Sequence, residues 1–146
     1  FNVFGPRQNP NGAYAAVIPR WIESIKNDGD VVINGDGLTS RDFCYIENTI
    51  EANILAATTP KIEEAKIYNV ALGDRTSLNE LAGYLYQAAR DNGIVREPKL
   101  IYKPFRDGDV RHSEADITKI RSELGYSGRV RVQDGIKKTV SWFLAQ

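Results

Sequence analysis

Apolar residues recur along this chain at two spacings, one typical of helices and one typical of strands. Positions three or four apart share a helix face, whereas short runs of β-branched and aromatic residues favour strands. Helical spacing occurs at residues 17–25, 46–55, 78–89, 117–124 and 136–143. Strand-like runs lie at residues 1–4, 31–33, 43–45, 66–70 and 100–102. Because short strands alternate with helices, we predict an α/β fold in one domain that spans residues 1–146.

Residues at the ends of these stretches sharpen the predicted boundaries. Ser77 and Glu80 have the spacing of a capping box, so a helix should begin at Leu78. Gly93 and Gly125 follow helical stretches and should end them. Residues 34–37, Asn-Gly-Asp-Gly, have the composition of a turn.

The chain begins with two bulky apolar residues, Phe1 and Phe4, and it contains no methionine. Such residues belong inside a protein, so we interpret residues 1–4 as the tail of a buried strand. We therefore expect the chain to be the C-terminal part of a longer protein. Apolar surfaces that the rest of that protein would cover should make the chain marginally stable or self-associating.

Composition excludes several classes of function. The chain has 146 residues, no net charge and 42% hydrophobic residues, which are the values of an ordinary globular domain. A neutral chain has no strong field to draw it to nucleic acid or to an anionic membrane. No apolar run approaches the roughly 20 residues of a membrane span. The single cysteine, Cys44, indicates a reducing compartment and a small core residue.

The densest group of chemically useful side chains lies at residues 103–116. Arg106 presents a planar fork that suits phosphate, and Asp109 could accept hydrogen bonds from a pair of ribose hydroxyls. Gly108 between them would let the backbone turn tightly. The same residues also suit a solvated charged loop, so both interpretations remain open from this stretch alone.

Three motifs together resemble those of one enzyme family. They are residues 1–7 (Phe-Asn-Val-Phe-Gly-Pro-Arg), Gly35-Asp36-Gly37 followed by Arg41-Asp42-Phe43, and Arg106-Asp107-Gly108-Asp109 followed by Ala115-Asp116. Their order and spacing resemble the extended short-chain dehydrogenases/reductases over essentially the whole chain. Within that family the likeness is to NAD-dependent epimerases, and in particular to UDP-N-acetylglucosamine 4-epimerases.

The resemblance implies that this chain is the substrate-binding C-terminal part of such an enzyme. In the family, an N-terminal Rossmann half holds NAD and a catalytic Tyr-x-x-x-Lys pair, and hydride passes from the sugar C4 to NAD and back to the other face. This sequence has no Tyr-x-x-x-Lys, so it should bind a UDP-N-acetylhexosamine without catalysing its epimerisation alone. Its expected partners are that Rossmann half and a second copy of the parent chain. The expected setting is cytoplasmic synthesis of surface polysaccharides.

The resemblance also assigns binding roles to individual positions. Arg41 and Arg106 match the arginines that clamp the diphosphate, and Asp109 matches the carboxylate on the uridine ribose. Ser113 matches a position on the sugar pocket wall, where a small residue leaves room for an acetamido group. The other matched contacts, to the diphosphate, the sugar, the nucleoside and the uracil, are Asn2, Gln8, Ala16, Val17, Val32, Ile33 and Asn34.

Several of these residues also have purely structural interpretations. Arg41 could form an ion pair with the adjacent Asp42, and Arg106 could pair with Asp109. Gln8 and Ser113 could be ordinary loop residues. His112, an apparent general acid, has no role in the family's mechanism, and we interpret it as structural.

Two other functions remain open for the same chain. A nucleotide-sugar 4,6-dehydratase or a UDP-glucuronate decarboxylase shares this scaffold and differs in acid and base residues outside it. A domain that binds nucleotides without chemistry would also account for the motifs.

Overall fold

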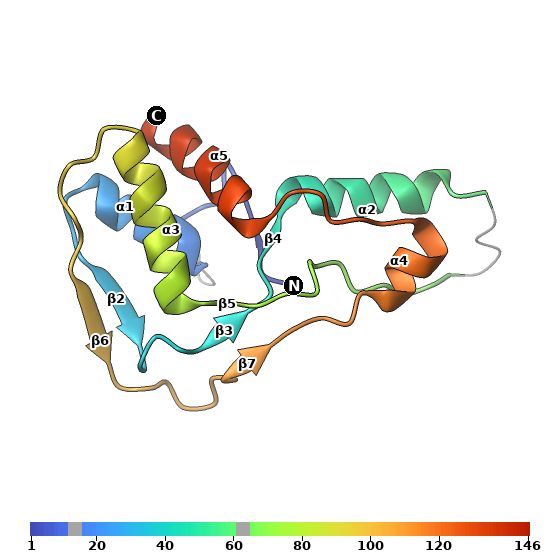
Figure 1. Cartoon of the computed structure of the whole chain (residues 1–146), viewed down its shortest axis with the longest axis horizontal. Coiled ribbons are helices and arrows are strands. Elements are labelled where there is room, and N and C mark those ends of the chain that lie inside the picture. Colours follow the sequence, from blue (N-terminus) through green and yellow to red (C-terminus); the bar gives the residue numbers. More distant parts are fainter. Residues whose placement is uncertain (12–15, 61–64) are drawn as a thin grey trace.

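The computed structural model describes residues 1–11, 16–60 and 65–146 and confirms the α/β fold. The five predicted helices are present as α1 (Val17–Lys26), α2 (Ile46–Thr58), α3 (Leu78–Asp91), α4 (Thr118–Leu124) and α5 (Val132–Leu144). The strands are short, namely β1 (Val3–Phe4), β2 (Val31–Asn34), β3 (Ser40–Arg41), β4 (Cys44–Tyr45), β5 (Thr76–Ser77), β6 (Leu100–Lys103) and β7 (His112–Ser113). Figure 1 shows α1, α3 and α5 at one end of the molecule, and α2 and α4 at the other.

The strands form three small sheets. β1 pairs with β4, and β2 pairs with β6, in both cases in parallel. β3 lies between β5, to which it is antiparallel, and β7, to which it is parallel. Parallel pairing joins segments far apart in the sequence, since β2 and β6 are aligned from Val31 opposite Leu100 to Asn34 opposite Lys103.

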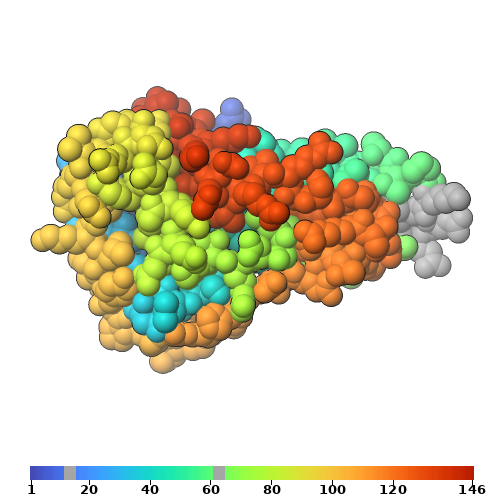
Figure 2. Space-filling model, viewed as in Figure 1, coloured from blue at the N-terminus to red at the C-terminus, as the bar shows by residue number. Residues whose placement is uncertain are grey.

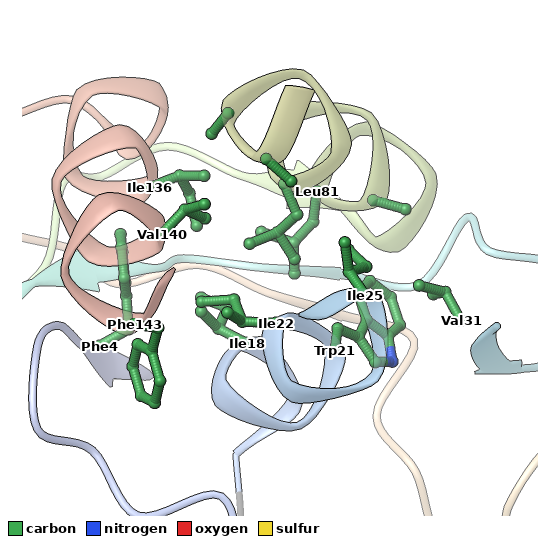
Figure 3. Close-up of a cluster of buried hydrophobic side chains, with 14 of the residues drawn as sticks. Phe4, Ile18, Trp21, Ile22, Ile25, Val31, Leu81, Ile136, Val140 and Phe143 are labelled. Atoms are coloured by element: carbon green, nitrogen blue, oxygen red, sulfur yellow. The ribbon is translucent and has the colours of Figure 1, made fainter. Parts of the chain in front are cut away.

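The main core lies between α1, α3 and α5. Figure 3 shows apolar side chains of these helices meeting one another, with Phe4 and Val31 at the margins. Leu81, Leu85 and Ile136 in this core are fully buried. The helical spacing read from the sequence therefore identifies the packed faces of all three helices. A second, smaller core under α2 and α4 consists of Ala52, Ala71, Ala115, Ile117, Ile120, Leu124 and Tyr126.

The capping box is formed as predicted and explains where α3 begins. The Ser77 hydroxyl accepts from the backbone N–H of Glu80 at 3.2 Å, and the Glu80 carboxylate accepts from the backbone N–H of Ser77 at 2.8 Å. Two N–H groups that have no partner within the helix are thereby satisfied. The Ser77 hydroxyl also donates to the Glu80 carboxylate at 2.6 Å, and this bond, with the one from the Ser77 backbone N–H, holds the pKa of Glu80 below its usual value.

One prediction about local structure is wrong. Residues 66–70 form no strand, and Ile67 is 87% exposed. Alternation alone does not make a strand, because its backbone groups need a neighbouring strand to pair with. In α2 the helix is correct, but Ile50 and Ile54 are exposed while Asn48 and Ala52 are buried.

The interpretation of residues 1–4 as a buried strand tail is correct only in part. Phe4 is buried at 2% exposure and pairs with Tyr45 across β1 and β4. Phe1 is 44% exposed and Val3 is 36% exposed. Together with the outer face of α2, these two side chains are apolar surface that the described residues leave uncovered.

Candidate functional site

A pocket of about 480 Å³ opens where α1, β2, β3 and the segment after β6 meet. This volume is typical of sites for small ligands. Eight of the eleven predicted site residues line it: Asn2, Ala16, Val17, Val32, Asn34, Arg41, Arg106 and Asp109. In Figure 2 the turn after β2 (cyan) lies between the start of α3 (light green) and the segment that joins β6 to β7 (orange).

The turn at residues 34–37 carries β2 past the pocket and into β3. Gly35 and Gly37 adopt φ angles of +86° and +76°, which side chains with a Cβ rarely adopt. A Cβ on Gly35 would collide with the ring of Phe105, and one on Gly37 with the amide of Asn79. The glycines therefore allow the turn to pack closely against α3 and the β6–β7 segment.

Arg41 is half-buried at the end of β3, and both ends of its guanidinium are held. Nη1 donates to the carbonyl of Ser40 at 2.9 Å, and Nη2 donates to the carboxylate of Asp109. The structure thus contradicts both ion pairs considered from the sequence. Arg41 does not pair with Asp42, and Asp109 pairs with Arg41 instead of Arg106.

Asp42, the neighbour of Arg41, is fully buried and points to the other side of the strand. Its carboxylate accepts hydrogen bonds from the backbone N–H groups of Leu72, Gly73 and Ala115 at 2.9 to 3.3 Å. Adjacent side chains of a strand face opposite ways, which explains why two neighbouring opposite charges do not meet.

Arg106 also lines the pocket, and a neutral side chain orients it. With the amide oxygen of Asn34 turned toward the guanidinium, that oxygen accepts from Nε at 3.0 Å and from Nη2 at 3.2 Å. The amide direction follows from the hydrogen-bond network. Because Asn34 carries no charge, this partner does not offset the positive charge of Arg106, which can then attract an anionic ligand.

The edge of β2 that borders the pocket presents backbone groups of Val32 and Asn34. The backbone N–H of Val31 donates to the carbonyl of Lys99, and that of Gly35 donates to the carbonyl of Lys103. The backbone groups of Val31 and Gly35 therefore point toward β6. Alternate residues direct their backbone groups to the opposite edge. The carbonyl of Val32 on that edge accepts from the indole Nε1 of Trp21 at 3.1 Å.

Three predicted site residues do not line the pocket. Ile33 is fully buried in the core beneath β2. The Gln8 amide donates to the carbonyl of Val3 at 3.2 Å, and its oxygen is buried without a hydrogen-bond partner among the described residues. Ser113 lies beside Arg41 in the β3–β7 pairing, next to the pocket lining.

His112 also has a structural environment, as expected. Its Nδ1 lies 2.8 Å from the hydroxyl of Ser40, the residue directly opposite it in the β3–β7 pairing. Neither residue lines the pocket.

Sequence reasoning missed several pocket residues, chief among them Trp21, Arg20, Lys103 and Asp30. Trp21, on the apolar face of the helix at residues 17–25, serves as both core and pocket wall. The described lining contains four positively charged side chains and two carboxylates. They are Arg20, Arg41, Lys103 and Arg106, and Asp30 and Asp109. The lining therefore carries an excess of two positive charges, although the whole chain is neutral.

One of these carboxylates is held ionised by groups outside the pocket. Arg96 donates to Asp30 at 2.7 Å, and this bond, with the N–H of Lys99, holds the pKa of Asp30 below its usual value. Outside the pocket lining, Arg111 lowers the pKa of Asp36 in the same way. Both acids are thus negative at neutral pH and already have partners.

The described residues do not have the usual features of a dinucleotide site. Such a site uses a glycine-rich turn that joins a strand directly to a helix N-terminus. The Gly35–Gly37 turn instead leads from β2 into β3. None of the described helices has the length and apolar content needed to cross a membrane.

Comparison with known proteins confirms the relationship suggested by the motifs. Residues 1–71 match the NAD dependent epimerase/dehydratase family. A UDP-N-acetyl-alpha-D-glucosaminuronate decarboxylase of Bacillus cytotoxicus is 32% identical over 144 residues, which is 98% of this chain and 44% of that protein.

Two solved structures share the fold over nearly the whole chain. A UDP-N-acetylglucosamine 4-epimerase of Methanobrevibacter ruminantium, in complex with UDP-N-acetylmuramic acid, has a TM-score of 0.87 and 37% identity, and the match covers 100% of this chain and 44% of that one. A UDP-glucose 4-epimerase of Thermotoga maritima, with UDP-glucose, has a TM-score of 0.82 and 37% identity, over 97% and 43% of the two chains. The chain thus spans less than half the length of these relatives.

Proposed function

We propose that this chain, a relative of enzymes of the NAD dependent epimerase/dehydratase family over nearly its whole length, binds the UDP part of a UDP-sugar in its pocket. The observation that carries the proposal is the pair of arginines, Arg41 and Arg106, on the lining of one pocket. A nucleoside diphosphate ester carries about two negative charges, and hydrogen bonds between ions are the strong ones. The excess of two positive charges on the lining suits that ligand.

The remaining parts of the nucleotide have suitable partners on either side of the arginines. The Asp109 carboxylate is an acceptor for the two ribose hydroxyls. The edge of β2 away from β6 presents backbone groups of Val32 and Asn34 to a planar base with polar edges, as uracil has; the Val32 carbonyl accepts from Trp21 and has a second lone pair for such a base. Ala16 and Val17 add small apolar contacts at the start of α1.

For the whole protein we propose NAD-dependent 4-epimerisation of UDP-N-acetylhexosamines, with NAD and the catalytic residues supplied outside this chain. The support for an acetamido-bearing sugar is the family resemblance, which places the small Ser113 on the sugar pocket wall; here Ser113 lies beside Arg41, next to the pocket lining. Decarboxylation of a UDP-uronate is the second candidate, because a curated relative of similar identity is a decarboxylase. Assays of the full-length gene product with UDP-GlcNAc, UDP-glucose and UDP-glucuronate separate 4-epimerisation from decarboxylation by the products that form.

The binding proposal is tested by calorimetry of the chain with UDP, UMP and uridine. Replacing Arg106 with alanine should weaken UDP binding by about 1.5–3 kcal/mol, the range for lost hydrogen bonds between charged groups, because the Arg106 side chain is exposed in the free protein. Uridine binding should change little in that variant. Arg111→Ala is the matched control, because Arg111 lies on the same segment but pairs with Asp36 outside the pocket. Equal losses in both variants, or no UDP binding by the wild type, would refute the proposal.

A further inference from the structure

The buried carboxylate of Asp42 connects three parts of the chain around the pocket. Oδ1 accepts from the N–H of Leu72 at 3.0 Å, and Oδ2 accepts from Gly73 at 2.9 Å and from Ala115 at 3.3 Å. The residue is 0% exposed. The Asp42 side chain, directly after β3, therefore forms hydrogen bonds with both the segment before β5 and the segment after β7.

The backbone of Asp42 extends the same connections toward the predicted ligand contacts. Its N–H donates to the carbonyl of Ser113 at 3.0 Å, and its carbonyl accepts from the Asn2 side chain at 3.4 Å. Arg41 precedes it in β3. Three of the predicted contacts, Asn2, Arg41 and Ser113, are thus bonded to Asp42 or adjacent to it.

Burying the Asp42 carboxylate costs free energy of folding. Taking a carboxylate out of water costs several kcal/mol unless good partners replace the water. In the described parts of the chain, no lysine or arginine lies within ion-pair distance of Asp42, and the donors to its carboxylate there are three backbone N–H groups. A carboxylate suits this place because it has acceptor sites for all three donors at once.

We propose that Asp42 is a positioning residue that sets the place of Arg41 in the pocket. By fixing β3 against the segments on both sides, it holds the Arg41 guanidinium where that group meets Asp109 and, in the complex, the diphosphate. Asp42 itself does not line the pocket. The binding part of this inference rests on the proposed function.

Asp42→Asn separates positioning from simple packing because the shape of the side chain is kept. The amide has one oxygen in place of two, and its NH₂ group would face at least one of the N–H donors. Asn48→Ala is the matched control for lost stability. Asn48 is 1% exposed and bonds both backbone groups of Val130, at 2.8 and 3.0 Å, away from the pocket.

The first readout is UDP affinity in a double-mutant cycle with Arg41→Ala. Residues coupled through one network show interaction energies that distant residues lack. Asp42→Asn should weaken UDP binding about tenfold in the wild-type background, and less than about twofold when Arg41 is already alanine. Asn48→Ala should leave the affinity of the folded protein within about twofold of the wild type.

The second readout needs no ligand. In the free protein, Arg41 donates to Asp109 and to the carbonyl of Ser40, so its guanidinium protons should exchange slowly in NMR spectra. That protection should be lost in Asp42→Asn and kept in Asn48→Ala. If Asp42→Asn does not fold, Asp42→Ser, which keeps one hydroxyl acceptor a bond nearer the backbone and adds no bulk, replaces it in both readouts.

The outcomes for the two proposals are distinct. A wild type that binds no UDP refutes the proposed function, and the protection of Arg41 then decides the role of Asp42 alone. A folded Asp42→Asn protein with wild-type protection of Arg41 overturns the positioning role. Equal loss of protection in Asn48→Ala also overturns it, because the effect would then be general destabilisation.

Discussion

Replacing Asp109 with asparagine should change the binding of two ligands in opposite directions. In the free protein the Asp109 carboxylate accepts from Arg41 and offsets one positive charge of the pocket. Asparagine keeps the size of the side chain and removes that charge, so Arg41 becomes available to phosphate oxygens and inorganic pyrophosphate should bind more tightly. Uridine should bind more weakly, because its hydroxyls lose a charged acceptor.

The size of each effect follows from the exposure of the pair. The Arg41 side chain is 18% exposed and that of Asp109 is 35% exposed, so water screens their attraction in part. Ion pairs near the surface contribute up to about 1 kcal/mol, which corresponds to about fivefold in affinity for pyrophosphate. Hydrogen bonds to a charged acceptor contribute about 1 kcal/mol more than those to the neutral amide oxygen that asparagine retains, so uridine should lose about fivefold in affinity.

Isothermal titration calorimetry at low ionic strength measures both ligands directly. Asp107→Asn is the control, because it makes the same change in net charge on the same loop but does not line the pocket. Tighter pyrophosphate binding in both variants would mean that overall charge, and not release of Arg41, is responsible. Weaker pyrophosphate binding in Asp109→Asn, or unchanged uridine binding, would refute the assignment of these two residues.

Two further predictions concern stability and reactivity. Gly83→Ala in α3 should stabilise the protein by about 0.5–1 kcal/mol through helix propensity, since nothing lies within 4 Å of the new Cβ. In Gly135→Ala of α5, the Cβ would lie 2.7 Å from the ring of Tyr45, so overpacking of about 1–3 kcal/mol should outweigh the same gain. Urea unfolding of both variants tests the opposite signs, and equal shifts would contradict them. Burial raises the pKa of the Cys44 thiol, so native protein should react with a thiol reagent half-maximally at higher pH than a free cysteine, and stability should fall as the pH rises above the ordinary thiol pKa. A native rate profile equal to that in urea would show that the thiol is not shielded.

The helices and the two longest strands could be predicted because their signals are local. The spacing of Ile18, Trp21, Ile22 and Ile25 marks the buried face of α1, and the capping box marks the start of α3. The strands β3, β5 and β7 have two residues each, too few to carry a pattern. They exist because Ser40 and Arg41 find partners more than 30 residues away on both sides.

The candidate site could be predicted where motifs mark it, and less well where tertiary placement decides. Arg41, Arg106 and Asp109 were identified from motifs, and all three line the pocket. The hydrogen-bond partners of these three residues could not be identified from motifs, although strand geometry already argues against contact between Arg41 and Asp42. Trp21 and Lys103 reach the pocket only through the α1–β2–β6 packing, which no short stretch of sequence encodes.

The long sequence separation of the pocket residues has a consequence for folding. Arg41 and Asp109 are 68 positions apart, and β2 is aligned with β6 at a separation of about 70. Loop-closure entropy must be overcome before such contacts form, which slows folding. A nucleotide can therefore recognise only the nearly complete native state, and by mass action it should slow global unfolding and protect the β6–β7 segment from proteases. Ligand-dependent protection of that segment would report when, along the folding pathway, the two halves of the site come together.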